Sequence, residues 1–323
     1  MDSTLHDTLT VLSAFRGLEV VLRVAPKTAK WVWERFLDHV DLPGKRRELI
    51  EALFVDKRDI LFHPGTDWRP AEGQTAPPYT ARGYPHEVRA LRAFTPFFPE
   101  ESRYQETLFF PSSLEGSSRL ICTGSTKTNN MVRKYLPSLE FKDGKARQQY
   151  ASFLRTEDLT YLFGEDLSAP MVEVVSMMSP GATKPKTRKM IWKWRAAGDL
   201  DTWQPKNYMS GKSLNSDFLL ISRLPRTSVG GDILIFAGGH GAGTEAVTLL
   251  LNQLPLSQLR DLVDQLQDKP YYQFVIEVTE VRHEATGTIP IQIKISDEMP
   301  PVKLPIGATN LRDKAVCPTK VWS

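Results

Sequence analysis

Residues 238–244 read Gly-Gly-His-Gly-Ala-Gly-Thr, and this stretch points most directly to chemistry. The preceding residues 232–237 are almost all apolar, which is typical of a strand buried on both faces in a parallel sheet. The following residues 245–251 have the pattern of a helix. A turn from strand to helix leaves backbone N–H groups at the helix N-terminus, where the helix dipole favours an anion. We therefore predict that this turn binds a phosphate.

Glycines permit a ligand to approach the backbone more closely than side chains would allow. The alternative is a tight strand-to-helix turn that holds no ligand. The ligand-binding residues predicted in this turn are Gly238, Gly239, His240, Gly241, Gly243 and Thr244.

A second strand, turn and helix follow the same order earlier in the chain. Residues 120–122 are apolar, a polar turn follows, and a helix is expected from about Asn129. Such turns lie at the carboxyl ends of parallel strands, where open α/β sheets place their ligands. Gly124, Ser125 and Thr126 are therefore assigned to the same ligand site. Serine and threonine also cap helices, so a capped helix start without a ligand is an equal alternative.

The charges of residues 182–198 are all basic, and two tryptophans are interleaved with them. Cations alternating with aromatic rings suit phosphate contact and base stacking. The commoner alternative is a solvated loop whose tryptophans point inward, and we favour that interpretation. The residues concerned are Lys184, Lys186, Arg188, Lys189, Lys193 and Arg195, with Trp192 and Trp194.

Together the two turns resemble a known family. The pattern CTGSTKTNN…Y of residues 122–135 resembles the first turn of the lysine-decarboxylase-like phosphoribohydrolases, and GGHGAGTEA of residues 238–246 resembles their second. The resemblance covers residues 119–251. It implies a Rossmann-like fold in which the backbone of the second turn holds a nucleotide phosphate. The wider group also includes inactive nucleotide sensors and effector domains of bacterial defence proteins.

The resemblance further implies two catalytic residues for N-glycosidic bond cleavage. Glu245 would orient or activate water, and Arg188 would steady the phosphate. This chain departs from the family pattern, because an extra residue splits its second glycine motif and one acid follows where the enzymes carry two. Arg188 also lies about twice as far from the glycine turn as the family's arginine. The phosphate site therefore carries over better than the catalytic residues do.

Composition excludes several classes of protein. The 323 residues are 41% apolar and 24% charged, with a formal net charge of +3, which is ordinary for a globular protein. No apolar run is long enough to span a membrane, and the first residues lack the basic start of a signal peptide. Two cysteines are too few for a disulfide framework, so we expect a cytoplasmic protein.

Residues 3–55 have the periodicity of three short helices. They suit a helix-turn-helix unit that binds DNA or a small adaptor that binds protein. Residues 1–63 hold ten basic and ten acidic side chains, and this balance favours the protein-binding alternative. Residues 63–85 contain five prolines and read as a linker or loop.

The expected fold is therefore an α/β, Rossmann-like parallel sheet with helices on both faces, preceded by a small N-terminal helical domain. The division is a helical domain at 1–62, a proline-rich linker or loop at 63–88 and the α/β domain at 89–323. The later pattern predicts a helix from near Pro255, a strand at 272–278 and another at 289–295.

Other chemistries find little support. The histidines form no metal-ligand cluster, and neither a nucleophile elbow nor a Walker lysine motif occurs. Cys122, at a strand end near a helix start, suits a nucleophile or, more commonly, a small core residue. No cofactor and no metal are expected.

Three functions remain open. The first is a sensor or effector domain that binds a nucleotide or phosphosugar, with the N-terminal helices as its output module. The second is a nucleotide N-glycosidase, and whether the chain is an enzyme stays open. The third is a DNA-binding regulator with an α/β effector domain. Residues 3–55 would contact a protein or DNA partner, a homo-oligomer is a further alternative, and no membrane contact is expected.

Overall fold

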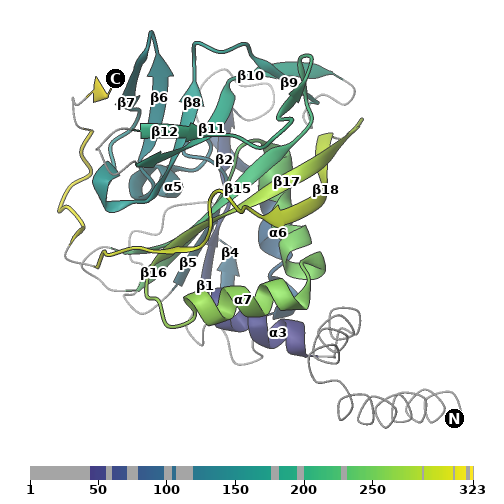
Figure 1. Ribbon diagram of the computed structural model, residues 1–323, viewed down its shortest axis with the longest axis vertical. Coiled ribbons are helices and arrows are strands. Elements are labelled where there is room, and N and C mark those ends of the chain that lie inside the picture. The colour runs from purple at the N-terminus through teal and green to yellow at the C-terminus, as the bar shows by residue number, and fades with distance from the viewer. Residues whose placement is uncertain are drawn as a thin grey trace, which may run out of the picture.

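Runs of apolar residues with both faces buried form the centre of the molecule (Figure 1). The computed structural model describes residues 44–55, 60–70, 79–97, 104–106, 119–175, 182–194, 200–226, 231–285, 287–307, 310–317 and 321–322. Within them lies an eight-stranded sheet of order β18-β17-β15-β16-β5-β1-β4, with β19 paired to β17. Its strands are β1 (Ile60–His63), β4 (Tyr104–Glu106), β5 (Arg119–Thr123), β15 (Asp217–Pro225), β16 (Asp232–Gly238), β17 (Tyr272–Glu284), β18 (Gly287–Ile295) and β19 (Val302–Lys303).

This sheet is parallel on one side and antiparallel on the other. Strands β4, β1, β5 and β16 run parallel to one another, and Leu120 of β5 pairs with Ile233 of β16. The predicted parallel pairing of these two strands is confirmed. Strands β15, β17 and β18 continue the sheet in antiparallel fashion.

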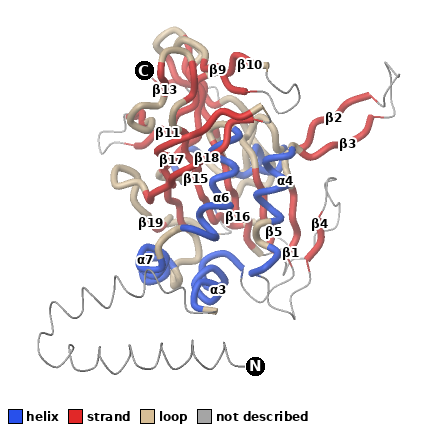
Figure 2. The backbone as a smooth tube through the Cα atoms, turned by 90° about the vertical axis from the view of Figure 1, so that its right-hand side faces the viewer, coloured by secondary structure: helices blue, strands red, loops and turns tan. Residues whose placement is uncertain are grey.

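Helices cover one face of the sheet (Figure 2). Alternation along β16 places Leu234 and Phe236 on this face and Ile233 and Ile235 on the other. The covering helices are α3 (Lys45–Ile50) with the π-helical turn Glu51–Val55, α4 (Pro85–Arg92), α6 (Gly241–Gln253) and α7 (Leu256–Leu266).

A second sheet covers most of the opposite face, together with the short helix α5 (Asn130–Tyr135). Side chains of this sheet, such as Phe163 and Ile191, share a buried cluster with Ile233 and Ile235. Its strands are β6 (Ser138–Lys142), β7 (Lys145–Gln148), β8 (Tyr161–Asp166), β11 (Arg188–Trp194), β12 (Leu200–Trp203) and β20 (Val321–Trp322).

The expected Rossmann-like fold is therefore wrong. The main sheet is mixed, strands outweigh helices, and a sheet covers the face where helices were expected. The reason is physical, because a strand buried on both faces has the same apolar pattern whether helices or strands cover it. Long antiparallel strands such as β15 and β17 are also buried on both faces over much of their length, so their apolar sequence pattern resembles that of parallel strands.

Two smaller sheets complete the described fold. A hairpin of β2 (Thr66–Pro70) and β3 (Tyr79–Gly83) projects from the body (Figure 2). A small sheet holds β9 (Val172–Val175), β10 (Thr183–Lys186), β13 (Met209–Ser210) and β14 (Ser213–Leu214). Part of the basic stretch at 182–198 therefore forms strands β10 and β11 instead of a loop.

The N-terminal helices expected before residue 44 lie outside the described residues. The described part of that segment, α3 and the turn after it, packs on the main sheet and on α7. In the stretch expected as a linker, the structure has β2, β3 and the start of α4. The division into domains stays a prediction. The predicted helix near Pro255 and the strands at 272–278 and 289–295 are present as α7, β17 and β18.

Candidate ligand-binding site

Both predicted turns open on one cleft of about 500 Å³. The cleft lies at the carboxyl ends of the parallel strands β5 and β16. Ser125 from the first turn and His240 from the second line it, and the start of α4 and strand β10 form its other walls. The two turns predicted as a site therefore lie together at one edge of the sheet, as expected for parallel strands whose carboxyl ends meet there.

The N-terminus of α6 already holds a hydrogen-bond acceptor, the carboxyl group of Asp217. Its oxygens accept hydrogen bonds from the backbone N–H groups of His240 at 3.0 Å and Gly243 at 2.6 Å. They also accept from the N–H group of Phe218 at 2.9 Å. Burial raises the pKa of Asp217 to about 7, although these three N–H bonds favour its charged form. A ligand phosphate would therefore not occupy the whole set of backbone donors that the glycine pattern suggested.

Close packing explains three of the glycines. A Cβ atom on Gly243 would lie 2.1 Å from the carbonyl oxygen of Phe218, and one on Gly238 would lie 2.2 Å from the nitrogen of Thr244. A Cβ on Gly239 would lie 2.4 Å from Oδ1 of Asp217. Gly238 and Gly239 also line the cleft, whereas Gly243 does not.

Gly241 differs, because its added Cβ would meet nothing closer than the His86 ring at 3.7 Å. It lines the cleft, as Thr244 does. In the described part of the chain the N–H groups of Gly241 and Ala242 have no hydrogen-bond acceptor. These two N–H groups at the start of α6 therefore make no hydrogen bond within the described residues.

The first turn is held by Asn129. Its amide oxygen accepts from the N–H groups of Met131 and Val132, which caps α5, and its amide nitrogen donates to the carbonyl groups of His63 and Thr123. Ser125 faces the cleft. Gly124 and Thr126 are buried and are not among the cleft-lining residues, so they shape the turn.

Glu87 from α4 is a site residue that the sequence did not reveal. Its side chain is 1% exposed and lines the cleft, where Oε1 accepts a hydrogen bond from the Thr128 hydroxyl at 2.8 Å. The carboxyl group packs against the backbone of Gly65 and Gly124, where any side chain would collide with it. Burial raises the pKa of Glu87 to about 8, against the effect of the Thr128 hydrogen bond. The group is therefore an uncharged carboxylic acid at neutral pH.

Four lysines line the cleft: Lys127, Lys184, Lys186 and Lys189. Lys189 is buried and bonded to Glu165, and burial lowers its pKa to about 8. Burial also lowers the pKa of Lys186, and repulsion from Lys127 and Lys184 adds to the effect. Within the described residues neither Lys184 nor Lys186 forms a salt bridge. Acidic side chains of the described residues therefore neutralise only part of the positive charge of the cleft.

Two neutral histidines also line the cleft. Burial, with a smaller effect of nearby cations, lowers the pKa of His240 to about 3 and that of His86 to about 4. The Tyr208 hydroxyl accepts from the N–H of Lys189 and lies 2.8 Å from Nε2 of His240. The Tyr208 hydroxyl therefore joins β11 to the His240 ring at the edge of the cleft.

The tryptophans of the basic stretch face away from the cleft. Trp192 is 4% exposed within the cluster between the sheets, and Trp194 donates to the carbonyl oxygen of Thr156. Lysines of the same stretch face the cleft instead, so phosphate contact and base stacking are not supplied by one surface. Other side chains form an apolar wall of the cleft: Tyr84, Pro85, Met171, Val174, Val175 and Pro185.

The two residues assigned to catalysis lie outside the cleft lining. Glu245 forms a salt bridge with Arg89 and so joins α6 to α4. The Arg188 guanidinium lies 5.8 Å from the centre of the Tyr208 ring. Alternation along β11 places Lys189 in the cleft and Arg188 on the other side.

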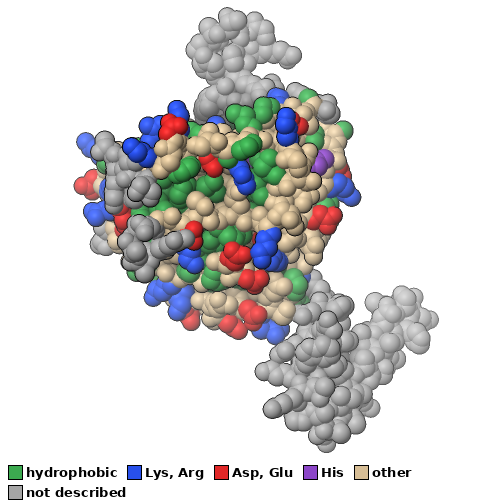
Figure 3. All heavy atoms as spheres, turned by 45° about the horizontal axis from the view of Figure 1, so that its top comes forward, with side chains coloured by type: hydrophobic (Ala, Val, Ile, Leu, Met, Phe, Trp, Pro, Cys, Tyr) green, Lys and Arg blue, Asp and Glu red, His purple; other side chains and the backbone are tan. Residues whose placement is uncertain are grey.

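The remaining chemistry considered from the sequence was a nucleophilic role for Cys122 and a metal site. Cys122 is fully buried in the cluster between the sheets, and burial raises the pKa of its thiol well above its usual range. No group of three or more His, Cys, Asp or Glu side chains in the described residues could hold a metal ion. No helix in the described ranges is long and apolar enough to cross a membrane. Charges of both signs are mixed over the face seen in Figure 3.

Comparison with models of protein families, with curated proteins and with solved structures found no match to this chain. The weak resemblance of the two turns to the phosphoribohydrolase group therefore stays a prediction.

Proposed function

We propose that the cleft binds a small phosphorylated ligand, a nucleotide or a phosphosugar, and that the chain is a sensor or effector domain. The observation that carries this proposal is the charge of the cleft. Four lysines line it, and the one carboxyl group among its described lining residues is uncharged at neutral pH. Lys127 and Lys189 share Glu165 as a counter-ion, whereas Lys184 and Lys186 have no salt bridge among the described residues, so the remaining positive charge supports a bound anion.

The walls favour a nucleotide over a phosphosugar. Side chains such as Met171, Val174 and Tyr84 offer an apolar and aromatic surface beside the lysines. A nucleobase would bury flat apolar area there, whereas a sugar phosphate lacks such a group. The hydroxyl group of Ser125 adds a hydrogen-bond donor for a phosphate oxygen, whereas the Thr128 hydroxyl already donates to Glu87.

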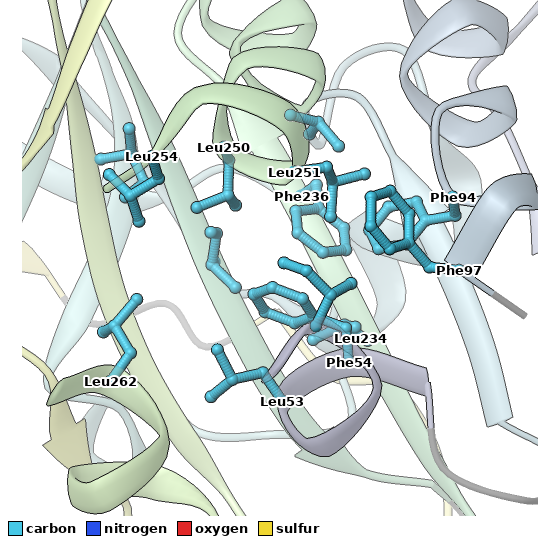
Figure 4. Packing of buried hydrophobic residues seen from close by; sticks show 14 of the residues in the cluster. Leu53, Phe54, Phe94, Phe97, Leu234, Phe236, Leu250, Leu251, Leu254 and Leu262 are labelled. Carbon is cyan, nitrogen blue, oxygen red and sulfur yellow. The ribbon is translucent and has the colours of Figure 1, made fainter. Parts of the chain in front are cut away.

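Packing behind the cleft supports a role in sensing. Phe236 of β16, just before the glycine turn, contacts Phe94 beyond α4 and Phe54 of the segment after α3 (Figure 4). The ring centres lie 5.1 and 5.6 Å apart. A change at the cleft thus has a packed route towards the segment that leads to the N-terminus. Catalysis through Glu245 is not proposed, because that side chain is paired with Arg89 outside the cleft.

Isothermal titration calorimetry with five probes tests the proposal: AMP, ADP, ATP, ribose 5-phosphate and adenosine. We expect ADP or ATP to bind at least about tenfold more tightly than adenosine, a difference of about 1.4 kcal/mol. Ribose 5-phosphate binding as tightly as ADP would identify a phosphosugar site. Equal binding of adenosine and ADP, or no binding of any probe, would refute a phosphate site.

A further inference from the structure

Glu87 is the one acidic residue among the described residues that line the cleft. The backbone is shaped around its carboxyl group. A Cβ atom on Gly65 would lie 1.8 Å from Oε2, and one on Gly124 would lie 2.3 Å from Oε1. A side chain at either position would displace Glu87, so both glycines keep this carboxyl group in place.

The surroundings of Glu87 do not provide a positive charge to pair with it. The Thr128 hydroxyl donates to Oε1 at 2.8 Å. Oε2 has no partner with hydrogen-bond geometry in the described residues, although the Gly65 backbone amide is close enough to favour the charged form. The nearest basic atom is Nε2 of His86, 3.8 Å from Oε1, and that ring is neutral because its pKa is about 4.

An uncharged acid suits an anion site for two reasons. Its O–H group can donate a hydrogen bond to a phosphate oxygen, whereas an ionised carboxylate would repel it. Other titratable groups share the cleft and must be separated from Glu87 in any test. They are His86 on α4 itself, Lys127 after β5, Lys184 and Lys186 on β10, Lys189 on β11 and His240 before α6.

We propose that Glu87 is a specificity-determining residue of this cleft, whose protonated carboxyl group donates a hydrogen bond to the anionic ligand and whose ionised form repels it. This inference rests on the proposed function, because it requires that the cleft binds an anion. It adds a condition that the lysines alone do not impose, namely that binding requires a proton on Glu87.

The test measures the dissociation constant of ADP from about pH 6.5 to about pH 9.5 for the full chain and for E87Q. If ribose 5-phosphate is the only probe that binds, it replaces ADP. Each proton that binding requires lowers the affinity about tenfold per pH unit above the pKa of its group. Lys189, whose pKa is about 8, contributes to this loss in both proteins. The glutamine keeps the size of the side chain and donates through its amide group at every pH.

We expect the affinity of E87Q for ADP to fall less steeply than that of the wild type above pH 8, with a difference of up to about tenfold per pH unit. Calorimetry in two buffers of different ionisation enthalpy should also show that the wild type takes up more protons than E87Q when it binds at pH 8.5. The matched control is E277Q, because Glu277 is a buried glutamate salt-bridged to Lys294 outside the cleft lining. Its pH profile should follow the wild type.

Two outcomes would overturn the inference, and they are distinguishable. Binding with the same pH profile and proton uptake in the wild type and E87Q would reject the role of Glu87 and leave the proposed function standing. Failure of every probe to bind at any pH would reject the proposed function, and this inference with it.

Discussion

The backbone N–H group of Gly243 donates a 2.6 Å hydrogen bond to Oδ2 of Asp217, which joins the start of α6 to the start of β15. The same carboxylate accepts from the N–H groups of His240 and Phe218. One internal side chain therefore takes much of the role that a ligand phosphate has at such a turn. This contact determines both the shape of the turn and which donors remain for a ligand.

Replacing Asp217 by alanine should destabilise the protein. D217A leaves three buried N–H groups without their acceptor, and we expect a loss of about 2–4 kcal/mol in the free energy of unfolding. Urea denaturation monitored by circular dichroism measures this loss. The control is D264A on the exposed side of α7, which should change stability by less than about 0.5 kcal/mol. Equal effects of the two variants would show that the carboxylate does not hold the turn.

The two glycines at the start of α6 should respond differently to alanine. G243A places a Cβ atom 2.1 Å from the carbonyl oxygen of Phe218, so we expect a loss of at least about 1–3 kcal/mol. G241A meets only the His86 ring at 3.7 Å, and it should be neutral or stabilising by up to about 1 kcal/mol. Thermal unfolding of the matched pair measures the contrast. The prediction fails if G241A is the more damaging change.

Removing a cleft lysine should weaken the binding of phosphorylated probes. K186A removes a charge that faces the cleft, and we expect about tenfold weaker ADP binding and a smaller dependence on salt. The control is K212A, a lysine on the exposed turn between β13 and β14 and outside the cleft lining. Calorimetry at low and high salt measures both. An equal loss in K212A would mean that general charge attraction, and not the cleft, binds ADP.

The stability of the wild type relative to E87Q should depend on pH. The pKa of Glu87 is raised from 4.5 to about 8 on folding, so the folded protein keeps a proton that the unfolded chain loses between these values. Raising the pH from 5 to 8 should therefore destabilise the wild type relative to E87Q by a few kcal/mol, roughly. Urea denaturation at both pH values provides the comparison. A constant difference between the two proteins would show that Glu87 ionises freely in the fold.

Much of the local structure follows from the sequence. The apolar runs before both glycine turns predicted strands, and their parallel pairing in one sheet is confirmed by the register of Leu120 with Ile233. These predictions succeed because burial on both faces and the glycine turn are encoded within a few neighbouring residues. They also placed both turns at the same edge of the sheet, where the cleft lies.

The cleft itself depends on residues far apart in the chain. Glu87 comes from a stretch whose prolines suggested a linker, and Asp217 was not predicted to have any role in the site. Neither carries a local signal, because the pKa of a carboxyl group depends on burial and on the donors that other elements bring to it. The assignment of Glu245 and Arg188 had the same weakness, since it rested on the resemblance of two short motifs to the phosphoribohydrolase pattern.

The sequence by itself determined the two strand–turn–helix units and their parallel pairing, because the residues that specify them are adjacent. Only the tertiary structure decided that a second sheet covers the main sheet opposite the helices, since apolar side chains pack equally well against either. It also decided that Asp217 caps α6 and that Glu87 and four lysines line one cleft. Burial and electrostatic environment are properties of the packed chain, and no single stretch of residues contains them.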